Sequence, residues 1–288
     1  MLKVAEIWRY PVKSMAGEKL DTAEVTTRGL PYDRGWAVRE DRTQAIRSAR
    51  YIPELLMCTA RTLPDTNAGL VPHVVIKLPD GSTVNSDDSR ANARLSEAVG
   101  RAVTLLPLRP PEDIEHLRHG PSVTGDPEKE LRMLMGLEAD DPLPDFSAIP
   151  PEIMKDLREL VTPRGTYFDA FTLHVVAAAT LRHLAQLLPD AQIAVPRFRP
   201  NLVIDDDAGS VQRLESQWVG KRLKIGACEI AGIMECPRCA IPSSAHPGLA
   251  RDRRITHTLA HEFRHALGLY CDIKSAGTVR VGDAVTLN

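Results

Sequence analysis

The sequence predicts an α+β protein, mostly β, in which an N-terminal β-barrel-like domain precedes a second β-barrel domain with flanking helices. Many short segments are rich in β-prone residues, and only a few have helical periodicity. No regular alternation of strands and helices and no glycine-rich phosphate loop is present, which argues against a dinucleotide-binding sheet. We place the domains at residues 1–110 and 111–288, because prolines and acidic residues accumulate between positions 109 and 151.

Short strands dominate the first hundred residues. We predict them at 3–10, 24–27, 36–38, 55–63, 74–78, 83–84 and 105–108. Asp80-Gly81 is typical of a hairpin turn between two of these strands. One helix is predicted over Ser86–Val99, with Ser86 as its cap and Gly100 as its end.

The second half begins with helices and ends with strands. Apolar residues recur at three- and four-residue steps over 151–161 and 172–188, and a short helix is predicted over 128–135. Further strands are predicted at 201–204, 223–225, 229–234 and 278–287, the last with a bend at Gly282-Asp283.

Composition excludes several classes of partner. The 288 residues carry a formal net charge of −2 and 5% aromatic residues, so we expect neither nucleic acid nor a membrane as partner. The N-terminus lacks a secretory pattern, and the most apolar stretch, 171–188, is too short and too polar to span a bilayer. The cysteines are odd in number, five, which favours a reducing cytoplasmic compartment over a disulfide framework.

The segment Cys236-Pro237-Arg238-Cys239 is the first candidate site. Taken alone it leaves four interpretations open: a zinc half-site, a dithiol redox pair, a single reactive thiolate suited to a soft metal, or two buried inert thiols. A zinc site would need partners at irregular spacing. A redox pair normally opens a helix, whereas Ile241-Pro242 follows here. The adjacent Arg238 favours a thiolate at Cys239.

Basic residues in polar turns form the second candidate. They lie at predicted strand ends beside a hydroxyl or amide neighbour, namely Lys13 with Ser14, Arg34, Arg50, and Arg199 with Asn201. Each one alone is typical of a solvated surface. If the strand ends meet, they would converge on an anion, because arginine binds phosphate through two parallel hydrogen bonds.

A third candidate is the H-E-x-x-H string His261-Glu262-Phe263-Arg264-His265. On a helix, His261 and His265 would share one face and hold zinc, with Glu262 as the base of a hydrolase. In the longer form of the motif a third histidine follows, and this chain has Cys271 there. We favour the alternative of a polar helix with solvent-facing histidines that continues from His257.

In their order, these segments resemble one family over residues 2–287. Two N-terminal segments resemble the β-barrel domain that precedes MOSC domains: Tyr10–Ser14 and Asp33–Trp36. Five later segments resemble the MOSC domain itself: Arg197–Asn201, Trp218, Lys224–Gly226, Cys236–Cys239 and Gly277–Asp283. Within this family the chain is similar to the mitochondrial amidoxime-reducing component and its bacterial counterparts.

The resemblance implies an oxidoreductase with a molybdenum cofactor, a pterin dithiolene that binds the metal together with one cysteine. It implies Cys239 as the molybdenum ligand and catalytic residue. Around the pterin and its phosphate it places Lys13, Ser14, Arg34 and Arg50, and near the metal or pterin it places Arg199, Asn201 and Arg238. The implied reaction is oxygen removal from N-hydroxylated small molecules.

Two departures leave the substrate open. Pro237 stands where the relatives have serine, and residues 240–247 replace a Thr-Thr-Val-Asp-Pro segment. Because no ferredoxin-type cysteine spacing is present, electrons would come from a separate reductase, ferredoxin or cytochrome.

MOSC domains also occur fused to cofactor sulfurases. A carrier of cofactor or sulfur without reductase turnover is therefore the alternative function. The sulfurase half is absent from this sequence, and we expect independence from pyridoxal phosphate.

Overall fold

A computed structural model describes residues 1–63 and 71–288 of the chain, and strands are its commonest regular element. The strands are β1 (Leu2–Arg9), β2 (Glu18–Leu20), β3 (Thr22–Val25), β4 (Trp36–Glu40), β5 (Thr59–Thr62), β6 (Val74–Lys77), β7 (Thr83–Asn85), β8 (Val103–Pro107), β9 (Leu173–Ala177), β10 (Leu202–Asp206), β11 (Arg222–Ile225), β12 (Cys228–Pro237), β13 (Ala266–Ser275), β14 (Gly277–Arg280) and β15 (Ala284–Leu287). The helices are α1 (Ala91–Val99), α2 (Pro127–Met135), α3 (Pro151–Glu159), α4 (Ala178–Leu187), α5 (Val195–Phe198) and α6 (Arg253–Glu262). The predicted α+β, mostly β class is confirmed.

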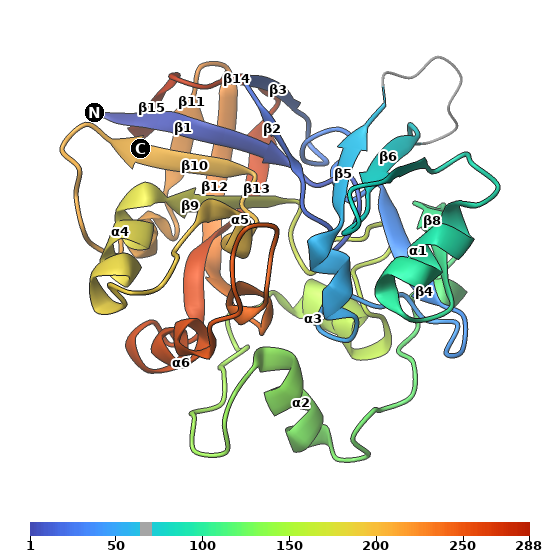
Figure 1. The fold of residues 1–288 in the computed structure, drawn as a ribbon. Helices are drawn as coiled ribbons and strands as arrows, with labels where there is room; N and C mark the ends of the chain where they lie inside the picture. The colour runs from blue at the N-terminus through green and yellow to red at the C-terminus, as the bar shows by residue number, and fades with distance from the viewer. Residues whose placement is uncertain (64–70) are drawn as a thin grey trace.

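Seven strands close into a barrel in the order β10-β9-β13-β12-β11-β15-β1, and β1 returns to β10. Neighbours are antiparallel except β9 and β10. Buried and half-buried residues alternate along β12, so one face of this strand points into the barrel, as expected for a barrel strand. The interior is filled by apolar side chains that include Val4, Ile7 and Trp218. Figure 1 shows β1 beside β10 along one side of the barrel.

A second core lies in the N-terminal half. The pair β4–β8, the sheet β5-β6-β7 and helix α1 enclose it, and they lie together on the right of Figure 1. The predicted boundary at residue 110 stays a prediction. Strand β1 belongs to the barrel, and Val12 and Met15, which follow it, pack in this second core before the chain returns to the barrel sheet at β2.

Helices α4, α5 and α6 pack at one end of the barrel around a third apolar cluster with Phe198 and Phe263 at its centre. Helix α2 stands apart from the barrel at the bottom of Figure 1. It begins at Asp126, whose Oδ1 accepts from the backbone N–H groups of Glu128 and Lys129, and it ends at Gly136. Among the helices in the described ranges, none has the length and apolar character needed to cross a bilayer.

Three predicted elements differ from the structure, and one strand was not predicted. The helix predicted over 172–188 is strand β9 followed by α4, because a strand buried on both faces shows no alternation. Residues 55–63 divide between a 3-10 turn and β5. Helix α1 begins at Ala91, since the Ser86 hydroxyl accepts from the backbone N–H of Val74 and caps no helix. Strand β13 (Ala266–Ser275), which pairs with β9 and β12 in the barrel sheet, was not predicted from the sequence.

Candidate functional site

A pocket opens at one rim of the barrel, where β1 and β12 end and β9 and β10 begin. Its cavity volume is about 70 Å³, and the space between the lining atoms, counted out into the open solvent at the mouth, is about 650 Å³. The lining brings together seven of the eight residues predicted to bind cofactor or metal: Lys13, Ser14, Arg34, Arg199, Asn201, Arg238 and Cys239. The eighth, Arg50, lines an adjoining pocket.

Three of the lining residues have left-handed backbone conformations. The φ angles of Ser14, Arg34 and Arg199 are 71°, 51° and 54°. A side chain at such an angle costs about 1–3 kcal/mol, and residues held in this way concentrate at functional sites. The turns after β1, before β4 and before β10 therefore store strain where the pocket forms.

Two guanidinium groups flank the ring of Tyr10. The Cζ atoms of Arg34 and Arg199 lie 4.5 and 4.3 Å from the ring centre. Burial and the nearby Arg34 lower the pKa of Arg199 to about 10. The Arg199 guanidinium donates to the backbone oxygen of Met15. This arrangement places two positive charges side by side at the rim.

The buried carboxylate of Asp33 fixes the backbone and side chains beneath these arginines. It accepts from Arg34 Nη1, from the backbone N–H of Tyr10 at 2.7 Å and from Asn201 Nδ2 at 2.7 Å. Asn201 Oδ1 also accepts from the backbone N–H of His174 at 3.1 Å. The amide of Asn201 is therefore committed to protein partners and shapes the pocket wall. The hydroxyl of Ser14 likewise accepts from the backbone N–H of Ala49.

Asp169 is a lining residue that the sequence analysis missed. Its Oδ1 accepts from Lys13 Nζ at 2.7 Å and lies 3.7 Å from Arg50 Nη2. Burial alone would raise the pKa of Asp169, but Lys13 and Arg50 hold it well below its usual range. Burial lowers the pKa of Lys13. No motif surrounds Asp169 in the sequence, and only the folded loop before β9 brings it to these cations.

The two cysteines of the C-x-x-C segment lie in different surroundings. Cys236, at the end of β12, is buried, and Cys239 is half-buried in the pocket lining. Arg238 Nη1 donates to Cys236 Sγ at 3.1 Å, so the thiol that this arginine contacts directly is that of Cys236. Its Nη2 donates to the backbone oxygen of Phe198 at 2.9 Å. Its Nε is buried and has no hydrogen-bond partner within the described ranges.

Positive charge exceeds negative charge around the pocket. The pocket is surrounded by Lys13, Arg34, Arg50, Arg199 and Arg238. In the part of the chain that the structure describes, the carboxylates that contact them are those of Asp33 and Asp169. Burial without a counter-charge is unfavourable for a guanidinium, so this excess favours an anionic ligand. An accessible thiol at the same pocket offers a soft donor for a metal carried by such a ligand.

The zinc-hydrolase alternative for His261, Glu262 and His265 is wrong. Helix α6 ends at Glu262, and Arg264 and His265 have φ angles of 53° and 61°. His265 is buried, whereas His261 is exposed, so the two histidines share no helix face. The expected polar helix with exposed histidines is present for His257 and His261, but it ends at Glu262, and His265 lies beyond it and is buried.

Comparisons with known proteins agree with the fold. Residues 163–286 match the MOSC domain family, and residues 1–99 match the MOSC N-terminal beta barrel domain. The mitochondrial amidoxime-reducing component 1 proteins of Mus musculus and Homo sapiens are each 25% identical, over 99% of this chain and 82% of the relative. A molybdenum cofactor sulfurase of Solanum lycopersicum is 26% identical over 87% of this chain, which spans 30% of that protein. The chain therefore belongs to the MOSC-domain family, with a MOSC N-terminal β-barrel domain preceding the MOSC domain.

Proposed function

We propose that this chain binds a molybdenum cofactor in the rim pocket, with Cys239 as the metal ligand, and reduces N-hydroxylated small molecules. One observation carries the proposal: an accessible thiol lies in the same pocket as a group of cations that exceeds its carboxylates. The similarity to amidoxime-reducing components supports the reaction class.

The donor set fits a pterin that carries a phosphate and a dithiolene-bound metal. In the proposal, Lys13, Ser14, Arg34 and Arg50 hold the phosphate side, and Arg199, Asn201 and Arg238 lie nearer the metal. The unpartnered Nε of Arg238 supports this assignment, because a buried donor without an acceptor is costly unless a ligand supplies one.

The bound metal would supply two-electron exchange, and the protein would bind, orient and shield it. For an amidoxime the N–O bond breaks, two electrons and two protons enter, and an amidine and water leave. In this proposal the electrons come from a separate reductase, ferredoxin or cytochrome-type protein. The left-handed turns at Ser14, Arg34 and Arg199 hold the cations in place before the ligand arrives. We also propose a cytoplasmic location, on the basis of the five unpaired cysteines.

The test uses protein made in a host that synthesises the pterin. We expect about one molybdenum per chain in the wild type and reduction of an aromatic amidoxime by a chemical electron donor. Cys239→Ala should lose both. Cys58→Ala, which removes a buried thiol of the N-terminal core, is the control and should keep both. A Cys239→Ala protein with full molybdenum and full activity would refute the assignment.

A cofactor or sulfur carrier is the second candidate, favoured by the similarity to the sulfurase of Solanum lycopersicum. In that case Cys239 would hold a persulfide. Mass spectrometry that finds an added sulfur on Cys239, with molybdenum content present and no amidoxime turnover, would favour the carrier over the reductase.

A further inference from the structure

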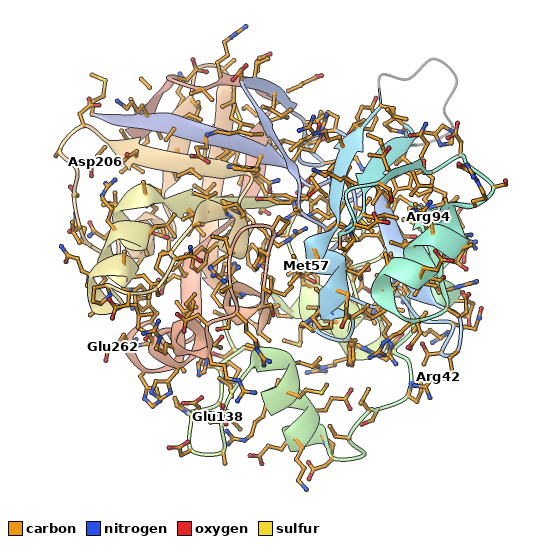
Figure 2. All side chains as sticks on the ribbon, viewed as in Figure 1. Arg42, Met57, Arg94, Glu138, Asp206 and Glu262 are labelled. Carbon is orange, nitrogen blue, oxygen red and sulfur yellow. The ribbon has the colours of Figure 1, made fainter. Side chains whose placement is uncertain are left out.

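A second cluster of metal-binding side chains lies on helix α6, outside the rim pocket. His257 and His261 are four residues apart and therefore share one helix face. Opposite them lies Asp141, from the segment between α2 and α3. Figure 2 labels Glu262, the last residue of α6, and Glu138, from the segment after α2, both in the lower part of the view. None of the three cluster residues lines the rim pocket.

The three side chains converge on a single atom. His257 Nδ1 and His261 Nε2 each lie 2.9 Å from Asp141 Oδ1, and the two ring centres are 4.4 Å apart. One nitrogen of each ring and the carboxylate oxygen all lie within 4.8 Å of one another. Tetrahedral zinc with bonds of about 2.0–2.1 Å separates its ligand atoms by roughly 3.3 Å, so a small outward movement admits an ion.

The carboxylate is a fixed anchor and the two rings are open to solvent. The side chain of Asp141 is 1% exposed, whereas those of His257 and His261 are 58% and 43% exposed. Asp141 Oδ2 accepts from the backbone N–H of Glu138 at 2.9 Å, and its backbone oxygen accepts from Arg132 Nη1 at 3.0 Å. Such outer partners hold a ligand in position, and the solvent side leaves room for water on the ion.

We propose that Asp141, His257 and His261 bind a divalent transition-metal ion of the zinc type, with water completing its coordination. Two imidazoles and a carboxylate are a donor set for borderline metals and a poor one for magnesium or calcium. The ion would clamp the segment after α2 to α6. Helix α2, which leads into that segment, contacts the cysteine loop, because Ala240 N donates to the backbone oxygen of Leu134 at 3.1 Å. The site is independent of the proposed molybdenum function.

The test measures binding of Zn²⁺ alone to full-length protein that has been stripped with a chelator. All variants carry Cys239→Ala as a common background, so that binding at that thiol does not obscure the result. We expect one Zn²⁺ per chain by calorimetry and a rise in melting temperature. His257→Gln and His261→Gln should each weaken binding by at least about tenfold and remove the rise. His119→Gln, at an exposed histidine elsewhere, is the matched control and should change neither.

Two outcomes would overturn the site. Absence of Zn²⁺ binding in the common background would show that the cluster is a hydrogen-bonded group only. Equal Zn²⁺ affinity in His257→Gln, His261→Gln and the His119→Gln control would place the ion elsewhere.

Discussion

Glutamine in place of Glu215 should raise the free energy of unfolding at pH 8 by about 3 kcal/mol. The Glu215 side chain lies in the 3-10 turn before β11 and is 1% exposed. It accepts from the Thr180 hydroxyl and from the backbone N–H of Gly268 at 3.0 Å. Burial raises the pKa of this carboxyl from 4.5 to about 7.

The direction and magnitude of this stability change follow from the difference in proton binding between the folded and unfolded chains. Between pH 4.5 and 7 the unfolded chain releases the proton of Glu215 while the folded chain keeps it, so the wild type loses stability as pH rises. At about 1.4 kcal/mol per pH unit, the loss approaches about 3 kcal/mol above pH 7 and is about 1 kcal/mol at pH 5. Glutamine removes this loss, because its oxygen can accept from Gly268 and its amide can donate to Thr180.

Urea unfolding at pH 5 and pH 8 measures the effect as the difference between variant and wild type. Glu262→Gln, on the exposed end of α6, controls for the removal of one negative charge. A difference that is the same at both pH values, or a Glu215→Gln protein that is less stable than the wild type at pH 8, would refute the reasoning.

Three further predictions concern other sites. Gly232→Ala should lower the free energy of unfolding by about 1–3 kcal/mol, because the Cβ of the new alanine would lie 2.4 Å from the backbone oxygen of Trp218. Urea unfolding measures this change, and a midpoint urea concentration equal to that of the wild type would contradict it. Burial lowers the pKa of His246 to about 4, so the free energy of unfolding of the wild type should fall by about 2 kcal/mol between pH 7 and pH 5 through this group. Urea unfolding at both pH values should show no such fall through this group in His246→Gln. Equal falls in the two proteins would contradict the prediction. Asp169→Asn leaves the Lys13 ammonium without its carboxylate, so the cofactor-free variant should have a lower melting temperature, equivalent to about 1 kcal/mol of unfolding free energy. Inorganic phosphate should restore part of this loss of stability. An unchanged melting curve would show that solvent fully screens the ion pair.

The sequence pattern predicts barrel strands best where one face meets water. The segments that form β1, β10 and β11 have alternating apolar and polar residues or are bounded by turn residues. Their predicted bounds lie within a few residues of the observed ones. β9 could not be separated from α4, because its five residues are all buried and the apolar run continues into the helix. The closure of β1 onto β10 depends on contacts about 200 residues apart, which no local pattern contains.

Residues of the rim pocket could be predicted from the sequence when they lie in turns at the ends of strands. Lys13, Arg34 and Arg199 were found in this way, and the structure brings them to one pocket. Asp169 was not, because a single carboxylate in a loop carries no pattern of its own. The zinc-hydrolase alternative, which the sequence did not favour, is excluded by the end of α6. The helix ends before left-handed residues at Arg264 and His265, and such a turn is normally signalled by glycine or asparagine.

The position of β1 in the barrel also constrains how the chain is made. Its partners β10 and β15 begin at residues 202 and 284, so the barrel cannot close around β1 until both of these distant strands have been synthesised. Pairings of this sequence separation are entropically expensive and fold slowly. Until then the nascent chain carries an unpaired edge on β1, and such an edge is open to pairing with other chains.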